Sequence, residues 1–537
     1  MGRSRAGDLR RRPRELTLSS VVKIIHTLAH RHAGRPALVA TAWDAQAGAY
    51  RTGSSCTYRE LYELALRVAD ALAARGIRRG DRVAVLLDNS AELVACEWAC
   101  LLSARILVAL NVRSSPSEHA AILGDCRPAA VVVASRYRDR IDAGALAPDT
   151  LVVEVGAGGS WNDFVASGRV RQPDDAPSAE EPVRLRYTSG TAGHPKGAVL
   201  ARRCYDASAE AVGDVIGPLF EGDVLAQVAP MTHAAGAMWL PHAVVGAKAL
   251  VADHFDARAF VDLVRRESVT SVFLVPTMLV RLLEAVAERP GRTPLRSIVY
   301  GGASMPADRL ERGLELLGAV FVQIYGLTES NWPVTALGRE DHIVGGSPEA
   351  RRKRLMSCGR PTAVGELRIV AGGGREARAG EPGEILVRGR NTMLGYWGTT
   401  ARDAKGLDAD GWMHTGDVAM RDDDGFVTIV DRLHDMIVSG GFNVYPREVE
   451  DALSQHPSVL EAAVVGRSDP EWGEHVHAVV VLRPGARVSE QELAAHVAER
   501  TAGYKKPRSF EFVAELPKNA AGKIMRRALK TAAPPAR

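Results

Sequence analysis

Helical and strand patterns alternate along most of the chain, and this alternation limits the fold more than any other feature of the sequence. A first helix is expected behind a capping box formed by Thr57 and Glu60. Its apolar face consists of Leu61, Leu64, Ala65, Val68 and Leu72. Gly76 ends this helix, and the run "DRVAVLLD" that follows is typical of a strand covered on both faces. The pattern predicts a layered α/β fold.

The same helix-and-strand unit recurs further along the chain. "SVTSVFLVP" leads into the helical pattern "TMLVRLLEAVAE", and "LRSIVYGG" leads into "MPADRLERGLELL". From residue 431 onward the expected elements are short, among them a helix that begins at Pro446 and another capped by Ser489 and Glu492. We therefore expect a flexible basic tail at residues 1–20, a large α/β body at 21–431 and a small α+β domain at 432–537.

Composition argues against some classes of partner. The net charge of +4 over 537 residues gives no support for nucleic-acid binding, which needs a concentrated basic face. The longest apolar run begins at Ala95 and is interrupted by Glu97 and Arg105, so we expect a buried helix followed by a strand and no membrane span. The six cysteines form no C-x-x-C pair, and the N-terminal segment lacks the apolar region of a signal peptide. These features favour a cytoplasmic protein with reduced thiols.

The stretch "YTSGTAGHPKG", residues 187–197, combines small and hydroxylated residues with a lysine. Its backbone N–H groups are unshielded by side chains, and Lys196 adds a positive charge, so the stretch suits an oxyanion such as phosphate. It is not a Walker A motif, because Pro195 precedes Lys196 and Gly197 follows it. Taken alone, the stretch fits either a phosphate loop or a flexible surface loop.

Four further stretches carry residues suited to nucleotide chemistry. "QIYGLTES" supplies a ring for stacking at Tyr325, a hydroxyl at Thr328 and a hard oxygen ligand for Mg²⁺ at Glu329. "GWMHTGDVA" contains Asp417, whose carboxylate can accept from both hydroxyls of a ribose. "DRLHDMIVSGGFNVYP" follows at the expected domain boundary, and "PKNAAGK" places Lys523 on a glycine-containing loop. Each stretch alone is also compatible with a structural role as a turn, a core ring or a solvated charge.

In their order along the chain, these five stretches resemble the successive core motifs of the AMP-forming acyl-adenylate superfamily. This superfamily includes acyl-CoA synthetases, firefly-type luciferases and peptide-synthetase adenylation domains. The resemblance covers nearly the whole chain, beginning at "TYRELYELALRVADALAARGIRRGDRVAVLLDNS". It implies a large multi-layer α/β body with a small mobile α+β C-terminal domain. It also implies a two-step reaction, in which a carboxylate attacks the α-phosphate of ATP–Mg²⁺ and a thiol, usually that of coenzyme A, then displaces AMP.

The resemblance assigns roles to individual residues. Thr328 would contact the α-phosphate, Glu329 with Thr188 would hold Mg²⁺, and Asp417 with Arg432 would bind the ribose. Lys523 would bridge the attacking carboxylate and the α-phosphate. The β- and γ-phosphates would be held by Thr188, Ser189, Gly190, Thr191, Ala192 and Lys196. The adenine pocket would comprise Gly302, Ala303 and Tyr325, and nucleotide binding is further expected at Gln323 and Gly326. After rotation of the small domain, a pantetheine tunnel would be lined by Ser439, Gly440 and Gly441. The hinge of that rotation falls on His434, where the family usually has Asp or Lys.

The acid and the acyl acceptor are less closely defined by the sequence. "PMTHAAGAMWLPH" resembles the family segment that borders the acyl pocket, which places His233 at that border among apolar and small neighbours. This segment has no Arg or Lys to pair with a second carboxylate, so an uncharged fatty or aromatic acid is favoured over a dicarboxylate. Coenzyme A is the expected acceptor, and an amine or a carrier-protein thiol is the alternative. A non-catalytic nucleotide-binding protein of the same fold is a remote alternative, and the oligomeric state is left open.

Overall fold

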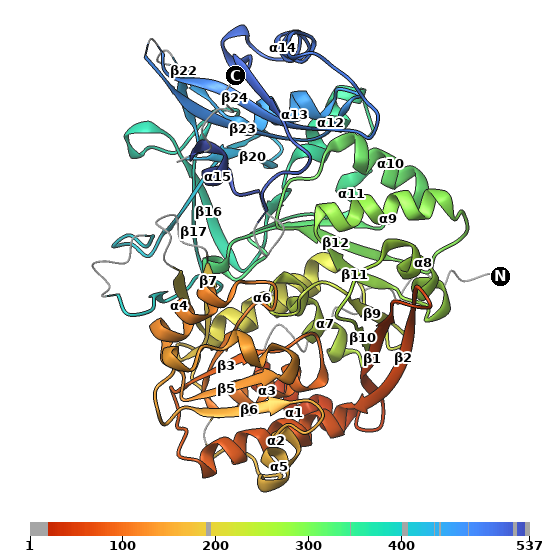
Figure 1. Ribbon diagram of the computed structural model, residues 1–537, viewed down its shortest axis with the longest axis vertical. Coiled ribbons are helices and arrows are strands. Elements are labelled where there is room, and N and C mark those ends of the chain that lie inside the picture. The colour runs from red at the N-terminus through yellow and green to blue at the C-terminus, as the bar shows by residue number, and fades with distance from the viewer. Residues whose placement is uncertain are drawn as a thin grey trace, which may run out of the picture. The chain divides into compact units, whose positions relative to one another are not determined.

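The computed structural model describes residues 20–174, 176–188, 195–343, 345–399, 406–433, 435–439, 442–470, 472–518 and 524–531. The described residues belong to two compact units. The first unit lies within Met1–Met305, Arg309–Glu366 and Val387–Met413. The second lies within Pro306–Asp308, Leu367–Leu386 and His414–Arg537. Figure 1 labels the elements of both units.

One large sheet of the first unit is parallel in its centre and antiparallel at both edges. Over the described residues it contains, in spatial order, β15 (Arg360–Pro361), β14 (Thr335–Leu337), β13 (Phe321–Tyr325), β12 (Ser297–Gly301), β11 (Ser271–Leu274), β9 (Val224–Gln227), β10 (Lys248–Val251), β1 (Pro36–Asp44) and β2 (Ala49–Thr57). The strands from β13 to β1 run parallel, whereas β14, β15 and β2 pair antiparallel with their neighbours. Parallel neighbours bring their carboxyl ends to one edge of the sheet, where ligands of α/β proteins commonly bind.

A second sheet of the first unit contains the strands on either side of the expected phosphate segment. Its described strands are, in spatial order, β18 (Gly395–Tyr396), β8 (Lys196–Ala201), β7 (Pro182–Thr188), β4 (Ile106–Ala109), β3 (Arg82–Leu86), β5 (Ala130–Ala134) and β6 (Leu151–Val155). The predicted strand "DRVAVLLD" is β3. Val83 and Val85 join one apolar cluster, whereas Ala84 and Leu86 join another, so this strand is covered on both faces as expected.

Helices surround both sheets of the first unit. The capping box that opens α2 is confirmed, because Thr57 N–H donates to Glu60 Oε2 at 2.8 Å and Glu60 N–H donates to Thr57 Oγ1 at 3.2 Å. The α-helices that begin in this unit or at its edge are α1 (Val21–Arg31), α2 (Tyr58–Ala74), α3 (Ala91–Ser103), α4 (Pro116–Cys126), α5 (Trp161–Ser167), α6 (Arg202–Ile216), α7 (Trp239–Val244), α8 (Ala257–Arg266), α9 (Pro276–Glu288), α10 (Ala307–Leu317), α11 (Arg339–His342) and α12 (Pro348–Met356). Short 3₁₀ helices are η1 (Ser135–Arg140), η2 (Ala143–Ala145), η3 (Ala234–Met238) and η4 (Thr328–Ser330).

The second unit is an α+β structure with two sheets. In its described part, β16 (Gly365–Val370), β17 (Gly383–Gly389), β19 (Met413–Arg421) and β20 (Val427–Arg432) form one sheet, and the division between the units falls within β16 and β17. The other sheet contains β22 (Phe442–Val444), β21 (Ile437–Ser439), β24 (Gly473–Leu482) and β23 (Val459–Asp469), with β25 (Ser509–Phe512) also paired to β24. Its remaining helices are η5 (Gly372–Gly374), α13 (Pro446–Ser454), α14 (Glu490–Ala498), η6 (Gly503–Lys505) and α15 (Arg526–Thr531).

The core of the second unit lies on both faces of the β21–β25 sheet. On one face, Val449 of α13 and Leu493 of α14 join an apolar cluster with Val464 and Val480 of the strands. On the other face, Leu529 of α15 joins Val465 and Val479. The chain therefore has the predicted fold, a large α/β body with a smaller α+β domain toward the C-terminus. Among the described residues, no helix is both long and apolar enough to span a membrane.

Candidate active site

Residues predicted for the adenine pocket meet at the carboxyl ends of β12 and β13. These strands are parallel neighbours with Gly301 opposite Ile324, so Gly302 and Ala303 follow β12 beside the end of β13. Gly302 has a φ of +86°, a conformation that favours glycine. The structure thus brings Gly302, Ala303, Tyr325 and Gly326 to one edge of the sheet.

Two side chains of β13 point to the same face of the sheet at this edge. Gln323 and Tyr325 are two residues apart on the strand, which places them on one side. Gln323 is buried, and its Oε1 lies 3.3 Å from the hydroxyl of Tyr300. Gly326 follows, and a Cβ there would lie 2.6 Å from Cβ of Trp332, so only glycine fits beside this tryptophan. Packing against Trp332 therefore explains Gly326, whereas a Cβ on Gly302 would have no atom within 4 Å, so the open backbone at this edge is that of Gly302.

The helix η4 places Thr328 and Glu329 next to the second sheet of the first unit. η4 packs against β7 and β8, the two strands on either side of the expected phosphate segment. Glu329 is half-buried, and its Oε1 accepts a hydrogen bond of 2.9 Å from the hydroxyl of Tyr396. The backbone carbonyl of Glu329 accepts from Met393 N–H at 2.8 Å. These bonds hold the proposed metal ligand against the segment that contains β18.

The expected phosphate segment begins and ends on a pair of antiparallel strands. Thr188, the last residue of β7, lies opposite Lys196, the first residue of β8. The ammonium nitrogen of Lys196 lies 5.4 Å from the centre of the Tyr396 ring, a cation–π contact. Lys196, Tyr396 and Glu329 therefore form a continuous chain of contacts. The remaining predicted residues of this segment, Ser189, Gly190, Thr191 and Ala192, lie outside the described residues.

Tyr396 is a candidate functional residue that the sequence reasoning missed. Burial and the nearby Glu329 carboxylate raise the pKa of its phenol, so the hydroxyl stays protonated and donates to Glu329. Its strand β18 is only two residues long and pairs Tyr396 with Ala198 of β8. The only signal in the sequence was an aromatic residue after Gly395, because a strand of this length has no periodicity.

The segment around His233 is packed closely against the core. His233 is half-buried, and its Nδ1 lies 2.9 Å from Oγ1 of Thr232. Met231 and Ala235 on either side belong to the main apolar cluster of the first unit. A Cβ on Gly236 would lie 2.1 Å from the Met231 carbonyl oxygen, which explains the glycine. The residues around His233 are thus tightly packed, and its place beside an acyl group stays a prediction.

In the second unit, Asp417 and Arg432, the two residues expected to bind the ribose, contact each other. They lie opposite each other on β19 and β20, and Arg432 Nε donates to Asp417 Oδ1 at 3.2 Å. Asp417 is buried, whereas Arg432 is exposed. The pairing orients the Asp417 carboxylate, whose oxygens are hydrogen-bond acceptors.

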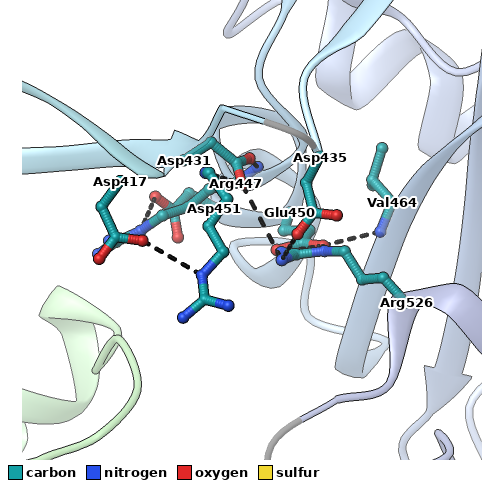
Figure 2. A network of polar contacts seen from close by, with 9 residues as sticks. Asp417, Asp431, Asp435, Arg447, Glu450, Asp451, Val464 and Arg526 are labelled. Carbon is teal, nitrogen blue, oxygen red and sulfur yellow. Dashed lines mark hydrogen bonds and ion pairs between the residues drawn. The ribbon is translucent and has the colours of Figure 1, made fainter. Parts of the chain in front are cut away.

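An ion-pair network of buried and half-buried groups adjoins this pair in the second unit (Figure 2). Arg526 Nη2 donates to Glu450 Oε2 at 2.7 Å, and Arg526 Nη1 lies 3.4 Å from Asp435 Oδ2 and 4.0 Å from Asp431 Oδ1. Asp431 also accepts from the backbone N–H groups of Arg432 and Arg447, at 2.7 and 2.8 Å. Burial raises the pKa of Glu450 and of Asp431, and these carboxylates raise the pKa of Arg526 against the opposite effect of its own burial. The sequence reasoning did not single out Arg526, since nothing in "GKIMRR" distinguishes it from a solvated charge.

Other predicted residues of the second unit are only partly covered by the structure. Ser439 is buried at the end of β21, opposite Phe442 of β22 and Gly473 of β24. Lys523, Gly440, Gly441 and the expected hinge residue His434 lie outside the described residues. Lys518 and Ile524, the described residues on either side of the segment that contains Lys523, form an isolated antiparallel bridge. In the described part of the chain, no three His, Cys, Asp or Glu side chains gather into a metal site.

Comparison with known proteins identifies the family. A family model for "AMP-binding enzyme" matches residues 25–397, and one for "AMP-binding enzyme C-terminal domain" matches residues 448–523. The chain is 37% identical over 491 residues to a feruloyl-CoA synthase from Amycolatopsis sp, covering 88% of this chain and 93% of that protein. It is 35% identical to the fatty acid–[acyl-carrier-protein] ligase ScoC from Streptomyces coeruleorubidus, covering 89% and 92%. The structure of the amide bond synthetase McbA from Marinactinospora thermotolerans matches with a TM-score of 0.83 at 30% identity, covering 95% of this chain and 99% of that one. The chain therefore belongs to the AMP-binding enzyme family, the AMP-forming acyl-adenylate superfamily that its motifs resemble, and it is an AMP-forming ligase.

Proposed function

We propose that this ligase activates a fatty or aromatic carboxylic acid as its acyl-adenylate and then transfers the acyl group to coenzyme A. The observation that carries the proposal is the chain of contacts from Lys196 through Tyr396 to Glu329. It joins the strand that follows the phosphate segment to the proposed metal ligand. Adenylation brings an anion against a polyanion, so its catalysis depends on positive charge and positioning of this kind.

In the first unit, we assign the candidate site residues to the phosphates, the metal ion and the adenine of ATP. We propose that residues 188–192 and Lys196 hold the β- and γ-phosphates, and that Thr328 contacts the α-phosphate. Glu329 and Thr188 offer hard oxygen donors that would suit Mg²⁺. When bound, this ion would neutralise phosphate charge. The adenine would lie at the edge formed by Gly302, Ala303, Gln323, Tyr325 and Gly326.

In the second unit, the buried carboxylate of Asp417 is suited to the ribose hydroxyls, with Arg432 fixing its orientation. We propose that Lys523 bridges the attacking carboxylate and the α-phosphate, where its positive charge stabilises the transition state. We also propose that residues 432–537 move as the small domain after adenylation. Ser439, Gly440 and Gly441 would then line the passage for the pantetheine arm.

A second candidate acceptor has support among the relatives. The named activities include a feruloyl-CoA synthase, which favours coenzyme A, but also a fatty acid–[acyl-carrier-protein] ligase and an amide bond synthetase. The alternative is therefore transfer of the same acyl-adenylate to a carrier-protein thiol or to an amine. The two candidates share the adenylation step and differ only in the second half-reaction.

ATP–pyrophosphate exchange with a panel of fatty and aromatic acids tests the first step. We expect exchange that depends on the acid, and a mass spectrum of the products with and without coenzyme A identifies the acceptor. Lys523→Ala should abolish exchange yet retain thioester formation from supplied acyl-adenylate. Lys518→Ala is the control, because this lysine forms a partly exposed ion pair with Glu461. An equal loss of both half-reactions in Lys523→Ala would contradict the assigned role, and no exchange with any acid would favour a non-catalytic nucleotide-binding protein.

A further inference from the structure

Strand β7 carries two buried arginines on one face. Arg184 and Arg186 are separated by a single residue, so their side chains point to the same side of the sheet. Arg184 has a counter-ion, since its Nη1 donates to Glu97 Oε1 at 2.9 Å and to the Tyr205 hydroxyl at 2.6 Å, although its Nε, like that of Arg186, has no hydrogen-bond partner among the described residues. Its Nη2 donates to the backbone carbonyl of Thr232 at 3.0 Å. Glu97 therefore neutralises Arg184.

Arg186 has no such counter-ion. It is only 8% exposed, its Nη1 donates to Asn331 Oδ1 at 2.9 Å, and its Cζ lies 4.3 Å from the centre of the Trp332 ring. Among the described residues no carboxylate forms an ion pair with Arg186, and its Nε has no hydrogen-bond partner. The neutral amide and the ring orient the guanidinium without balancing its charge.

The charges around Arg186 do not cancel. Of the described carboxylates, Glu97 acts on both arginines, and it is bonded to Arg184. Burial raises the pKa of Tyr205, so this phenol stays neutral. The guanidinium of Arg186 is a cation at neutral pH, because arginine keeps its proton in proteins. One positive charge thus remains uncompensated in the interior, an arrangement that is unfavourable unless a bound anion neutralises it.

The unbalanced cation contacts residues next to the proposed catalytic motifs. Arg186 lies two residues before Thr188, and its partners Asn331 and Trp332 follow Glu329 closely in the chain. On the same face of β7, Arg184 donates to the backbone carbonyl of Thr232, the residue before His233 in the segment expected to border the acyl group. The face of β7 that carries Arg186 therefore contacts both that segment and the residues that follow Glu329.

We propose that Arg186 determines substrate specificity by binding a second carboxylate of the acid substrate, in addition to the carboxylate that is activated. The inference rests on the function proposed above and narrows its substrate to dicarboxylic acids with an apolar skeleton. A carboxylate can accept from two guanidinium N–H groups at once and compensates the buried charge. The expectation of an uncharged acid was based on residues 230–242, which contain no Arg or Lys. Arg186 lies outside that segment, on β7.

Two matched pairs of acids test the proposal: benzene-1,4-dicarboxylate against 4-methylbenzoate, and octanedioate against octanoate. The measured quantity is the ratio of kcat/KM for dicarboxylate and monocarboxylate in ATP–pyrophosphate exchange. We expect the wild type to favour the dicarboxylate of at least one pair by roughly 100-fold, and Arg186→Met to abolish this preference. Arg186→Lys keeps the charge and should retain a preference of about tenfold.

The outcomes separate this inference from the proposed function. Two results would overturn the role of Arg186: exchange with monocarboxylates alone, or the same dicarboxylate-to-monocarboxylate ratio of kcat/KM in wild type and Arg186→Met. Neither result would contradict the proposed ligase activity. If no acid supported exchange, including the fatty and aromatic acids of the first panel, the result would contradict the proposed function itself. If Arg186→Met does not fold, the shift in the melting temperature of the wild type on addition of each acid tests the proposal instead. The melting temperature should rise with the dicarboxylate and stay unchanged with its monocarboxylate partner, and equal shifts would contradict the proposal.

Arg105→Met is the matched control for burial. Arg105 is another buried arginine, but its Nε and Nη2 both donate to the Ile77 carbonyl, at 3.1 and 2.7 Å, and its Nη1 donates to Ser103 Oγ. Its donors are thus satisfied by the protein. We expect Arg105→Met to lower the melting temperature and to leave the ratio of the two kcat/KM values unchanged.

Discussion

At the scale of single residues, Tyr396 makes two contacts that can be separated by mutation. Its hydroxyl donates to Glu329 Oε1 at 2.9 Å, and its ring lies 5.4 Å from Lys196 Nζ. Tyr396→Phe keeps the ring and removes the hydrogen bond, which leaves the proposed Mg²⁺ ligand less firmly oriented. Because loss of a partner that orients a metal ligand costs about 10- to 100-fold in metal affinity or activity, we expect a roughly tenfold rise in the Mg²⁺ concentration needed for half-maximal exchange.

Tyr137→Phe is a suitable control for that measurement. The Tyr137 hydroxyl donates to Asp88 Oδ1 at 2.8 Å, so the same type of hydrogen bond to a carboxylate is lost away from the proposed site. Its Mg²⁺ dependence should match that of the wild type. An unchanged Mg²⁺ dependence in Tyr396→Phe would show that the hydroxyl does not orient a metal ligand.

The sequence indicated candidate site residues where several reactive or ligand-binding side chains occur within one short motif. Glu329 with Thr328, and Asp417 two residues after Thr415, stand out because a carboxylate and a hydroxyl occur close together near a glycine. Arg186 and Tyr396 could not be found in this way. The importance of Arg186 depends on the pairing of Glu97 with Arg184, and that of Tyr396 on the pairing of β18 with β8. Both are contacts between segments far apart in the chain, which no local pattern encodes.

At the scale of elements, one guanidinium joins the end of β20, α13 and the start of α15. Arg526 of α15 contacts Glu450 of α13 and the two aspartates Asp431 and Asp435 (Figure 2). Arg526→Met leaves the buried Asp431 and the half-buried Glu450 and Asp435 without their cation, and such a loss costs about 3 kcal/mol. We expect the free energy of unfolding of the second unit to fall by this amount, measured by denaturant titration of the full chain with circular dichroism.

Two further variants identify the cause of this loss. Arg527→Met changes the exposed neighbour and should alter stability by no more than about 0.5 kcal/mol. The double variant Arg526→Met with Glu450→Gln removes the unpaired charge at Glu450 and should recover part of the stability. If Arg526→Met and Arg527→Met were equally stable, the network would have no structural role.

The elements themselves were predicted well where periodicity is strong. The continuous apolar run at residues 81–88 became β3, and the capped helix that follows Thr57 became α2. Short strands were not predictable, since β15 and β18 have two residues each and no pattern of their own. They form because longer neighbours offer free hydrogen-bonding edges, a condition set by the tertiary fold.

At the scale of the whole molecule, buried neutral histidines couple folding to pH in both units. Burial lowers the pKa of His242 and His342 in the first unit, and of His477 in the second, to about 4 each. In the unfolded chain a histidine titrates near pH 6.5, so between pH 6.5 and 4 the unfolded state binds a proton that the folded state does not. Their contribution to stability is fully present above pH 6.5 and is lost as the pH falls toward 4.

His342→Gln tests this coupling at one position. His342 is buried, with Nδ1 2.7 Å from the Gly338 carbonyl and Nε2 2.9 Å from the Tyr300 hydroxyl. The variant should be less stable than wild type at pH 7.5. The difference between their free energies of unfolding should decrease by up to about 1.4 kcal/mol per pH unit as the pH falls from 6.5 to 4. Buried carboxylates with raised pKa values, such as Glu450, titrate in the opposite sense but contribute equally to both proteins. His30→Gln changes an exposed histidine and is the control, for which the difference in free energy of unfolding from wild type should not depend on pH. The same independence of pH in His342→Gln would contradict the lowered pKa of His342.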